Sequence, residues 1–359
     1  MSTILIKDTL RQAVEAASGG AQTVLYTAKN QPTYMNIIEK FDLSKVSPTL
    51  SGTHPAFIID GKEHDVIYIG TYQGVLRNGE LLSLPNQATT VSVAYDDFLM
   101  AAKANGKGHH LITNAEWSAL ALYSEMNKTQ PKGNTYYGQS VEASYLFGRR
   151  TDGKKPGDAS STLDGRTFTG SGPVEWRHNG QYNGVSDLSG NAHEICSGAR
   201  LVNGELQIIV NNNAASINID MSSNSMEWKA IDGRTGLFIQ PNGLGTTPTS
   251  VKYTDDPLVS ADFTLRVGNF GSIVNTSVQA PVQEAALNVL RTLLFFPVSK
   301  NPNVYGGNRI GILKSGEVIP ARGGTYREGL YAGIYRNYMA FPRASVNGET
   351  GSRPAFYKA

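Results

Sequence analysis

Histidine and acidic side chains are the residues through which this chain could hold a metal ion. His109 and His110 are adjacent, so on a strand they face opposite sides and cannot both bind one ion. His178, His193 and Glu194 could form a zinc site only if the fold brought them together. No H-E-x-x-H pattern supports such a site. The sequence therefore favours no bound metal.

Covalent and cofactor chemistry also lacks a recognisable pattern. Cys196 is the only cysteine, which excludes an internal disulfide and a cysteine-based zinc cage, and we expect it to be a small buried side chain. Serine, histidine and aspartate are all present, but no G-x-S-x-G elbow accompanies them. Residues 242–247 (NGLGTT) lack the lysine of a phosphate loop and predict a turn. We therefore expect no cofactor and no enzymatic activity.

Charge and hydropathy narrow the range of partners. The 359 residues include 32 Lys and Arg against 30 Asp and Glu, so a net charge of +2 gives no reason to expect nucleic acid or an anionic membrane as a partner. No apolar run approaches the roughly 18 residues of a membrane span. The charged N-terminus is no secretory signal. We expect cytoplasmic synthesis, no membrane insertion, and either release or assembly on a particle for any role outside the cell.

The last stretch of the chain, residues 323–359, has the composition of a binding surface. It neither alternates like a strand nor repeats like a helix. Its aromatic residues are too many for a disordered tail. Rigid aromatics mixed with adaptable polar residues on a glycine-defined backbone are typical of antibody paratopes.

The N-terminal 50 residues differ in character from the rest. They predict short helices over residues 4–17 and 34–40, the first of them ended by Gly19 and Gly20. We interpret residues 1–50 as a helical adaptor or oligomerisation element. A helix that simply packs on the main domain is an equal alternative.

Residues 51–359 predict an α+β domain with short strands, two or three helices and heavy loop content. Strands are expected over 56–60, 66–76 and 88–93, with hairpin turns at residues 60–61 and 78–79. Helices are expected over 95–105 and 114–127, and Thr113 with Glu116 matches a capping box for the second. Residues 128–183 predict mostly loop.

The second half of this domain predicts a β-rich insert over about 205–280. Residues 201–212 predict a hairpin about Asn203 and Gly204. Short strands are expected over 216–220, 236–240 and 251–254. A helix over 283–294 and a buried strand over 295–298 complete the prediction.

Three segments together resemble one family. Residues 108–117 (GHHLITNAEW) resemble the GxRLPTEAEW segment of C-type lectin folds of the formylglycine-generating-enzyme type, and residues 184–195 (GVSDLSGNAHEI) resemble their GNVWEW-containing segment. Residues 323–357 are similar to the variable region of diversity-generating-retroelement target proteins, which include phage tropism determinants. The resemblance spans about residues 55–359 and implies a C-type lectin fold whose C-terminal positions are diversified on a fixed scaffold.

Departures from the family pattern remove its chemistry. His193 and Ile195 replace the usual tryptophans, and the enzymes of this fold need a cysteine pair that this chain lacks. Asp187, Asn191 and Glu194 are expected to fix a loop rather than bind calcium. Trp117 is expected in the core, and Arg353 is expected to anchor backbone or a carboxylate.

The resemblance implies a ligand-binding protein that recognises a host-surface protein or glycan, for phage or prophage receptor binding. Alternatives are a structural tail component or an enzyme of the same fold. A homo-oligomer, such as a trimer, or assembly on a tail particle would suit this role. The predicted contacts are Tyr326, Arg327, Glu328, Leu330, Tyr331, Ile334, Tyr335, Arg336, Asn337, Tyr338, Met339, Phe341 and Asn347.

Overall fold

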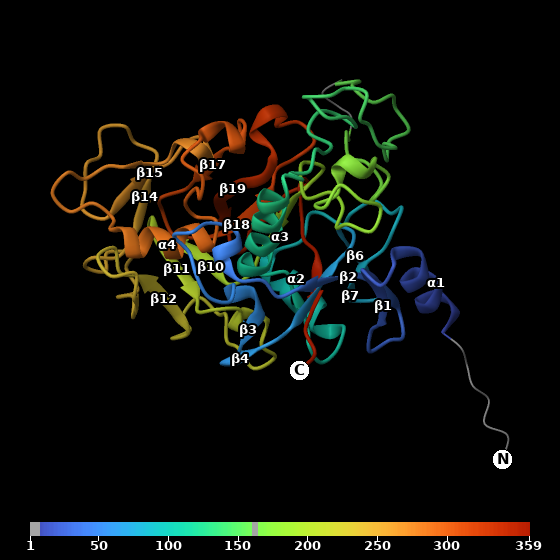
Figure 1. Ribbon diagram of the computed structural model, residues 1–359, viewed down its shortest axis with the longest axis horizontal. Coiled ribbons are helices and arrows are strands. Elements are labelled where there is room, and N and C mark those ends of the chain that lie inside the picture. The colour runs from blue at the N-terminus through green and yellow to red at the C-terminus, as the bar shows by residue number, and fades with distance from the viewer. Residues whose placement is uncertain (1–7, 160–163) are drawn as a thin grey trace, which may run out of the picture.

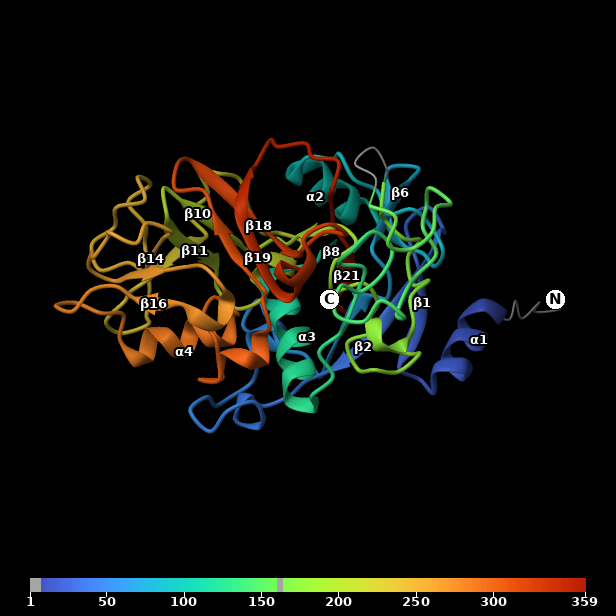
Figure 2. The same cartoon turned by 90° about the horizontal axis from the view of Figure 1, so that it is seen from above.

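The computed structural model describes residues 8–159 and 164–359. Within them the chain mixes α-helix and β-sheet. The four α-helices of the described residues are α1 (Thr9–Ser18), α2 (Tyr95–Ala104), α3 (Asn114–Asn127) and α4 (Glu284–Thr292). Helix α1 lies at one end of the molecule, α3 near its centre and α4 towards the opposite end (Figures 1 and 2).

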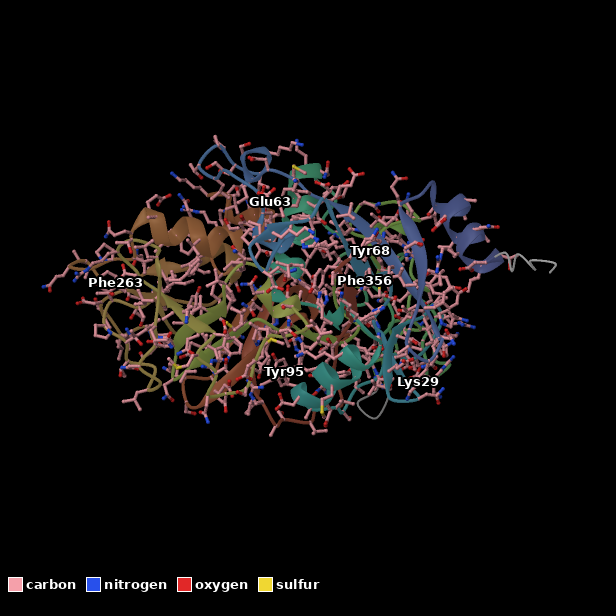
Figure 3. All side chains as sticks on the ribbon, turned by 90° about the horizontal axis from the view of Figure 1, so that it is seen from below. Lys29, Glu63, Tyr68, Tyr95, Phe263 and Phe356 are labelled. Atoms are coloured by element: carbon pink, nitrogen blue, oxygen red, sulfur yellow. The ribbon has the colours of Figure 1, made fainter. Side chains whose placement is uncertain are left out.

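A five-stranded antiparallel sheet lies beside α1. Its strand order is β1 (Gln22–Tyr26), β2 (Pro32–Glu39), β5 (Val66–Gly70), β21 (Pro354–Phe356) and β8 (His109–Leu111). The last strand of the chain, β21, is therefore hydrogen-bonded between β5 and β8. The ring of Tyr68 on β5 packs edge to face against that of Phe356 on β21, with 5.4 Å between their centroids (Figure 3).

A second, twelve-stranded sheet fills the other half of the molecule. Its main path is β16 (Val274–Asn275), β15 (Thr264–Arg266), β14 (Lys252–Thr254), β11 (Glu205–Ile209), β10 (Ala199–Val202), β18 (Glu317–Gly323), β19 (Gly333–Pro342) and β17 (Ile310–Ile312). The branches are β9 (His193–Ile195), β12 (Trp228–Ile231), β13 (Phe238–Ile239) and β20 (Thr350–Gly351). The predicted β-rich stretch over 205–280 thus contains β11 to β16.

Two hairpins and the helices confirm the strongest local predictions. Strands β3 (Ile58–Ile59) and β4 (Lys62–Glu63) pair about residues 60–61, and β6 (Gly74–Arg77) and β7 (Glu80–Ser83) pair about residues 78–79. All four turn residues have positive φ, as the tight turns of hairpins require. Helices α2 and α4 lie where they were expected, and so does the β10–β11 hairpin.

Helix α3 is the central support of the fold. It begins with the predicted capping box: the Glu116 amide donates to Thr113 Oγ1 at 3.0 Å, and the Thr113 amide donates to Glu116 Oε2 at 2.9 Å. Residues 114–122 of the helix are buried on every side. Trp117 is in the core as predicted, and its Nε1 donates to the Ile334 carbonyl on β19 at 2.9 Å.

The expected helix over residues 34–40 is wrong. These residues lie in β2, which pairs with β1 on one side and β5 on the other. Thr33, Met35 and Ile38 are buried by these neighbours, and such non-local pairing overrides a weak local preference. Within residues 8–50 the expected all-helical character is therefore corrected, because this stretch contains α1 and the two strands β1 and β2 of the first sheet. Residues 4–7 of the first predicted helix lie outside the described residues.

Three predicted strands are also wrong. Residues 88–93 form no strand, because Thr89 and Thr90 bond to the β6 backbone through their hydroxyls. Residues 216–220 form a turn after a short 3-10 helix. Phe295 is buried as expected, but residues 295–298 fold back onto α4 through amides that donate to the Leu290 carbonyl.

Candidate binding face

The C-terminal segment turns sharply between β18 and β19. The two strands are antiparallel, and residues 324–332 connect them through a short 3-10 helix at Gly329–Tyr331. Gly324 has φ +84°, and a Cβ there would come within 2.6 Å of the Ala332 Cβ. A side chain at residue 324 would therefore break the turn. Gly323 has φ +83°, so both glycines hold backbone conformations that a side chain would strain.

The thirteen predicted contact residues divide by exposure. Four are exposed: Arg327, Leu330, Tyr331 and Asn347. Glu328 and Tyr338 are half-buried. The remaining seven are buried, and our expectation that they stand on the surface is wrong: Tyr326, Ile334, Tyr335, Arg336, Asn337, Met339 and Phe341.

Strand β19 is buried because it lies between β18 and β17 and has a core on each face. Tyr335 packs against Phe270 and Tyr305, at 5.7 and 4.8 Å between ring centroids. Phe341 belongs to a separate cluster with Tyr95 of α2. An aromatic residue suits a core as well as a binding surface, so composition alone could not separate the two.

The turn is held by an ion pair between buried Arg336 and half-buried Glu328. Arg336 donates to Glu328 Oε1 and Oε2 at 2.6 and 3.2 Å, and Glu328 also accepts from the Thr325 amide. His193 lies below, with its ring stacked on Tyr338 and its Nε2 3.7 Å from Glu328. Burial lowers the pKa of His193 to about 4, so it is neutral at pH 7. Glu328 and Arg336 therefore shape the turn.

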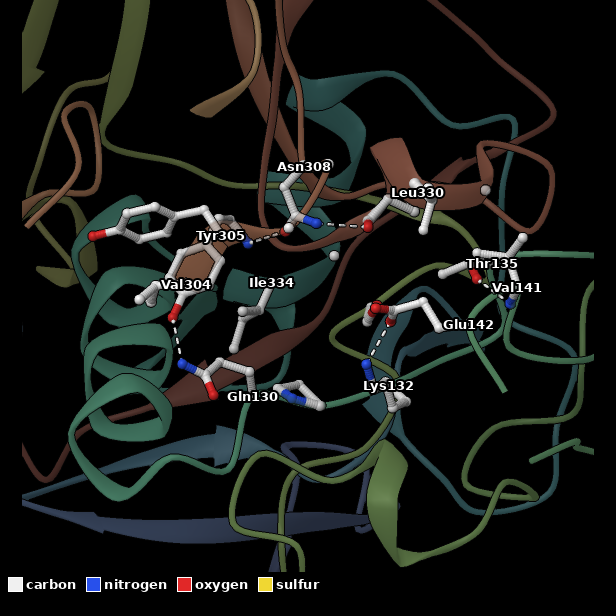
Figure 4. Close-up of a pocket in the computed structure, with 18 of the residues that line it drawn as sticks. Gln130, Lys132, Thr135, Val141, Glu142, Val304, Tyr305, Asn308, Leu330 and Ile334 are labelled. Carbon is white, nitrogen blue, oxygen red and sulfur yellow. Dashed lines mark hydrogen bonds and ion pairs between the residues drawn. The ribbon is translucent and has the colours of Figure 1, made fainter. Parts of the chain in front are cut away.

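A cavity of about 290 Å³ opens beside this turn (Figure 4). Its walls come from residues 130–142, residues 303–308 and residues 329–335. Leu330, Ile334 and Tyr335 are the predicted contacts that line it. Gln130 Nε2 lies 3.4 Å from the Tyr335 hydroxyl, and Asn308 Nδ2 donates to the Ala332 carbonyl at 2.9 Å.

The cavity lining suits binding. Apolar side chains such as Val141 and Val304 alternate with amides and an ion pair between Lys132 and Glu142 at 2.7 Å. Behind the wall, the Tyr305 hydroxyl donates to Glu125 at 3.3 Å, and burial raises the pKa of that carboxyl. Such a mixture orients a ligand through a few polar groups on an apolar surface.

The predicted loop-fixing residues have the roles assigned to them. Asp187 Oδ2 accepts from the Gly170 amide at 2.8 Å, and Asn191 Oδ1 accepts from the Thr167 amide at 2.7 Å. Arg353 donates to both oxygens of Glu194, at 2.7 and 2.6 Å, and to the Gly70 carbonyl. Arg353 thus anchors both backbone and a carboxylate, as the sequence predicted.

The histidines and the cysteine considered for metal or covalent chemistry lie in separate structural environments. His110 Nε2 bonds Glu116 at 2.7 Å, and His178 Nδ1 accepts from the Val185 amide at 2.8 Å. Cys196 is buried, and burial raises the pKa of its thiol. Across residues 8–159 and 164–359, no three His, Cys, Asp or Glu side chains gather as a metal site would need.

The far wall of the cavity is the part that sequence reasoning missed. Residues 130–142 were predicted only as loop, although they face the turn. The Gly329 amide donates to the Thr135 carbonyl at 3.0 Å, and the Tyr137 amide donates to the Tyr326 carbonyl at 2.7 Å. The available signal was the alternation at 145–147, where Leu146 is buried between exposed Tyr145 and Phe147.

Comparison with known proteins identifies no family for this chain. No protein-family model matches the chain, and no curated protein matches it. In the described part of the chain, no helix is both long and apolar enough to cross a membrane.

Proposed function

We propose that this chain is a recognition protein with a C-type lectin-like fold that binds a host-surface ligand through the turn at 326–331 and the cavity beside it. On this proposal the protein acts in phage or prophage receptor binding and is carried on a tail particle. It performs no catalysis and needs no cofactor.

The observation that carries the proposal is that the turn is exposed while the strands on either side of it, β18 and β19, are paired in the sheet. Leu330 and Tyr331 are 55% and 49% exposed, while the residues before and after them are held by β18 and β19. Exposed large apolar side chains on a rigid backbone lose little entropy on binding. Leu330 also lines the cavity, so one ligand could contact both.

The meeting of the three family-like segments supports the fold assignment. Strand β9 of the second segment pairs with β20 of the third, and also with β18, which ends where the third segment begins. Strand β8 of the first segment pairs with β21. Arg322, directly before the third segment, donates to Asn114 at the start of α3. Residues that resemble one family in sequence thus form one connected unit.

The burial of β19 favours a second candidate, a structural component of a tail. Seven of the thirteen predicted contacts are buried, which leaves few positions free to vary. In that case the exposed turn would pack against a neighbouring subunit.

Cell binding separates the two candidates. Fluorescently labelled protein would be titrated on a panel of bacterial strains and measured by flow cytometry. We expect saturable binding to some strains, and a loss of at least 30-fold for the double variant Leu330→Ser, Tyr331→Ser, because truncated hot-spot residues cost about 2 kcal/mol or more. The melting temperature should not change, since both side chains are exposed. If no strain binds, the recognition proposal fails.

A further inference from the structure

Exposed apolar side chains gather on the loop that faces the proposed binding turn. Tyr136, Val141, Tyr145 and Phe147 are 37%, 41%, 78% and 56% exposed, and all lie within twelve residues. Leu330 and Tyr331 of the turn complete a set of six. Isolated exposed apolar residues are ordinary, whereas a cluster on adjoining segments marks an interaction surface.

The two segments form one continuous surface. Backbone hydrogen bonds join residue 137 to 326 and residue 329 to 135. The rings of Tyr137 and Tyr326 pack edge to face beneath them, with 5.2 Å between centroids. Val141 and Leu330 both line the same cavity, as Figure 4 shows.

The loop is ordered by its own hydrogen bonds. The Ser140 amide donates to the Leu146 carbonyl, and Gln139 bridges both Tyr136 and Phe147. Buried Leu146 fixes the segment, so its neighbours on either side point outward. The exposed rings are therefore presented on a defined backbone, as contacts in a specific interface must be.

The charges around this surface are unbalanced. Glu142 and Glu349 are each held by a cation, Lys132 and Arg327 respectively. Arg309 is exposed, lies 5.4 Å from the Tyr331 ring centroid, and has no carboxylate within 4.0 Å among the described residues.

Two further cations stand near the loop. Lys154 and Lys155 are exposed, and their ammonium groups form no ion pair within that distance in the described chain. Their segment is tied to the loop by the Gly157 amide, which donates to the Tyr137 carbonyl at 2.8 Å. These three cations favour an anionic partner over a cationic one.

We propose that the 136–147 loop and the 326–331 turn form one composite docking surface for a protein partner that carries apolar side chains flanked by carboxylates. The inference rests on the proposed recognition function. It adds the 136–147 loop to the binding surface and a protein as the class of ligand. Aromatic residues and arginine, here Arg309, are among the residue types that contribute most of the binding energy in protein interfaces. A loop outside the C-terminal segment would then help to fix specificity.

The test uses the full chain and whole cells of a strain that binds it. We expect the double variant Tyr145→Ser, Phe147→Ser to weaken cell binding by about 30-fold or more at unchanged melting temperature. The matched control is Tyr182→Ser with Leu258→Ser, which removes two side chains that are 85% and 90% exposed elsewhere. The control should bind like the native protein.

Charge and ligand class are tested on the same cells. Arg309→Glu should weaken binding, and added salt should weaken the native protein more than this variant. Treatment of the cells with proteinase K should abolish binding, whereas mild periodate, which cleaves sugar rings, should leave it.

Each contrary result has a distinct meaning. Loss of binding with the turn variant but not with the loop variant would overturn the composite surface and leave the recognition function standing. Loss after periodate alone would overturn the protein partner in favour of a glycan. If the loop variant instead abolished a concentration-dependent dimer seen by sedimentation, the occupant would be a second copy of this chain. Absence of any cell binding would defeat both proposals.

Discussion

At the residue scale, the pair formed by Arg353 and Glu194 shows how the C-terminal scaffold is fixed. Both side chains are buried, and Arg353 also donates to the carbonyls of Gly70 and Ser186. It thereby joins the first sheet to the segment that contains Asp187. A buried charge that loses its partner is costly, whereas an exposed pair contributes little.

Arg353→Met is therefore expected to lower the free energy of unfolding by about 3–5 kcal/mol, because it leaves the Glu194 carboxylate buried and unpaired. Chemical denaturation measures the change. Arg327→Met is the matched control, since Arg327 forms an ion pair with Glu349 but is largely exposed, and its cost should stay below about 1 kcal/mol. Equal losses from the two variants would contradict the anchoring role.

At the element scale, the starts of α3 and α2 can be compared directly, because α3 has a side-chain cap and α2 has none. Thr113 caps α3 and also donates to Asn212, whereas Ala94 precedes α2 with no side-chain hydrogen bond. We expect Thr113→Ala to cost about 1–2 kcal/mol and Ala94→Ser to stabilise the protein by about 0.5–1 kcal/mol. Denaturant midpoints measure both changes. A stability loss from Ala94→Ser would show that the α2 start cannot use a cap.

The same elements explain how much of the fold could be predicted. The capping box of α3 and the turn at Asn78 and Gly79 are local signals, and both were placed correctly. Residues 34–40 were predicted as a helix, but all except the last lie in strand β2. Pairing with β1 and β5 gives these residues their extended conformation, and neither partner can be identified from residues 34–40 alone. Pairing between distant segments leaves little trace in one sequence.

The candidate site was predictable to a similar degree. The glycines that shape the turn and the exposed Leu330 and Tyr331 could be read from composition. The buried Tyr335 could not, because Tyr305 and Phe270, which cover it, come from a distant part of the chain. The facing loop was missed for the same reason, since only hydrogen bonds across the fold bring it to the turn.

At the scale of the whole molecule, four of the five histidines buried among the described residues make the fold sensitive to acid. Burial lowers the pKa of His54 and His178 to about 3, and that of His109 and His193 to about 4. The unfolded chain takes up protons near pH 6.5, while the native state does not. Stability is therefore full above pH 6.5 and falls as the pH drops towards 4. Glu125, whose pKa burial raises, acts in the opposite direction but is one group against four.

Between pH 6.5 and 4.5 each histidine should remove roughly 2–3 kcal/mol, a large share of the 5–15 kcal/mol that holds a typical protein folded. Denaturant midpoints at pH 7.5, 6 and 5 measure the loss. His109→Phe is the informative variant, because His109 packs against Phe356 and its buried Nδ1 has no protein partner within the described residues. Phenylalanine keeps the ring contact and removes the titration, so the variant should be more acid-stable than the native protein. A midpoint that stays constant from pH 7.5 to 5 in the native protein would contradict the neutral buried state of these rings.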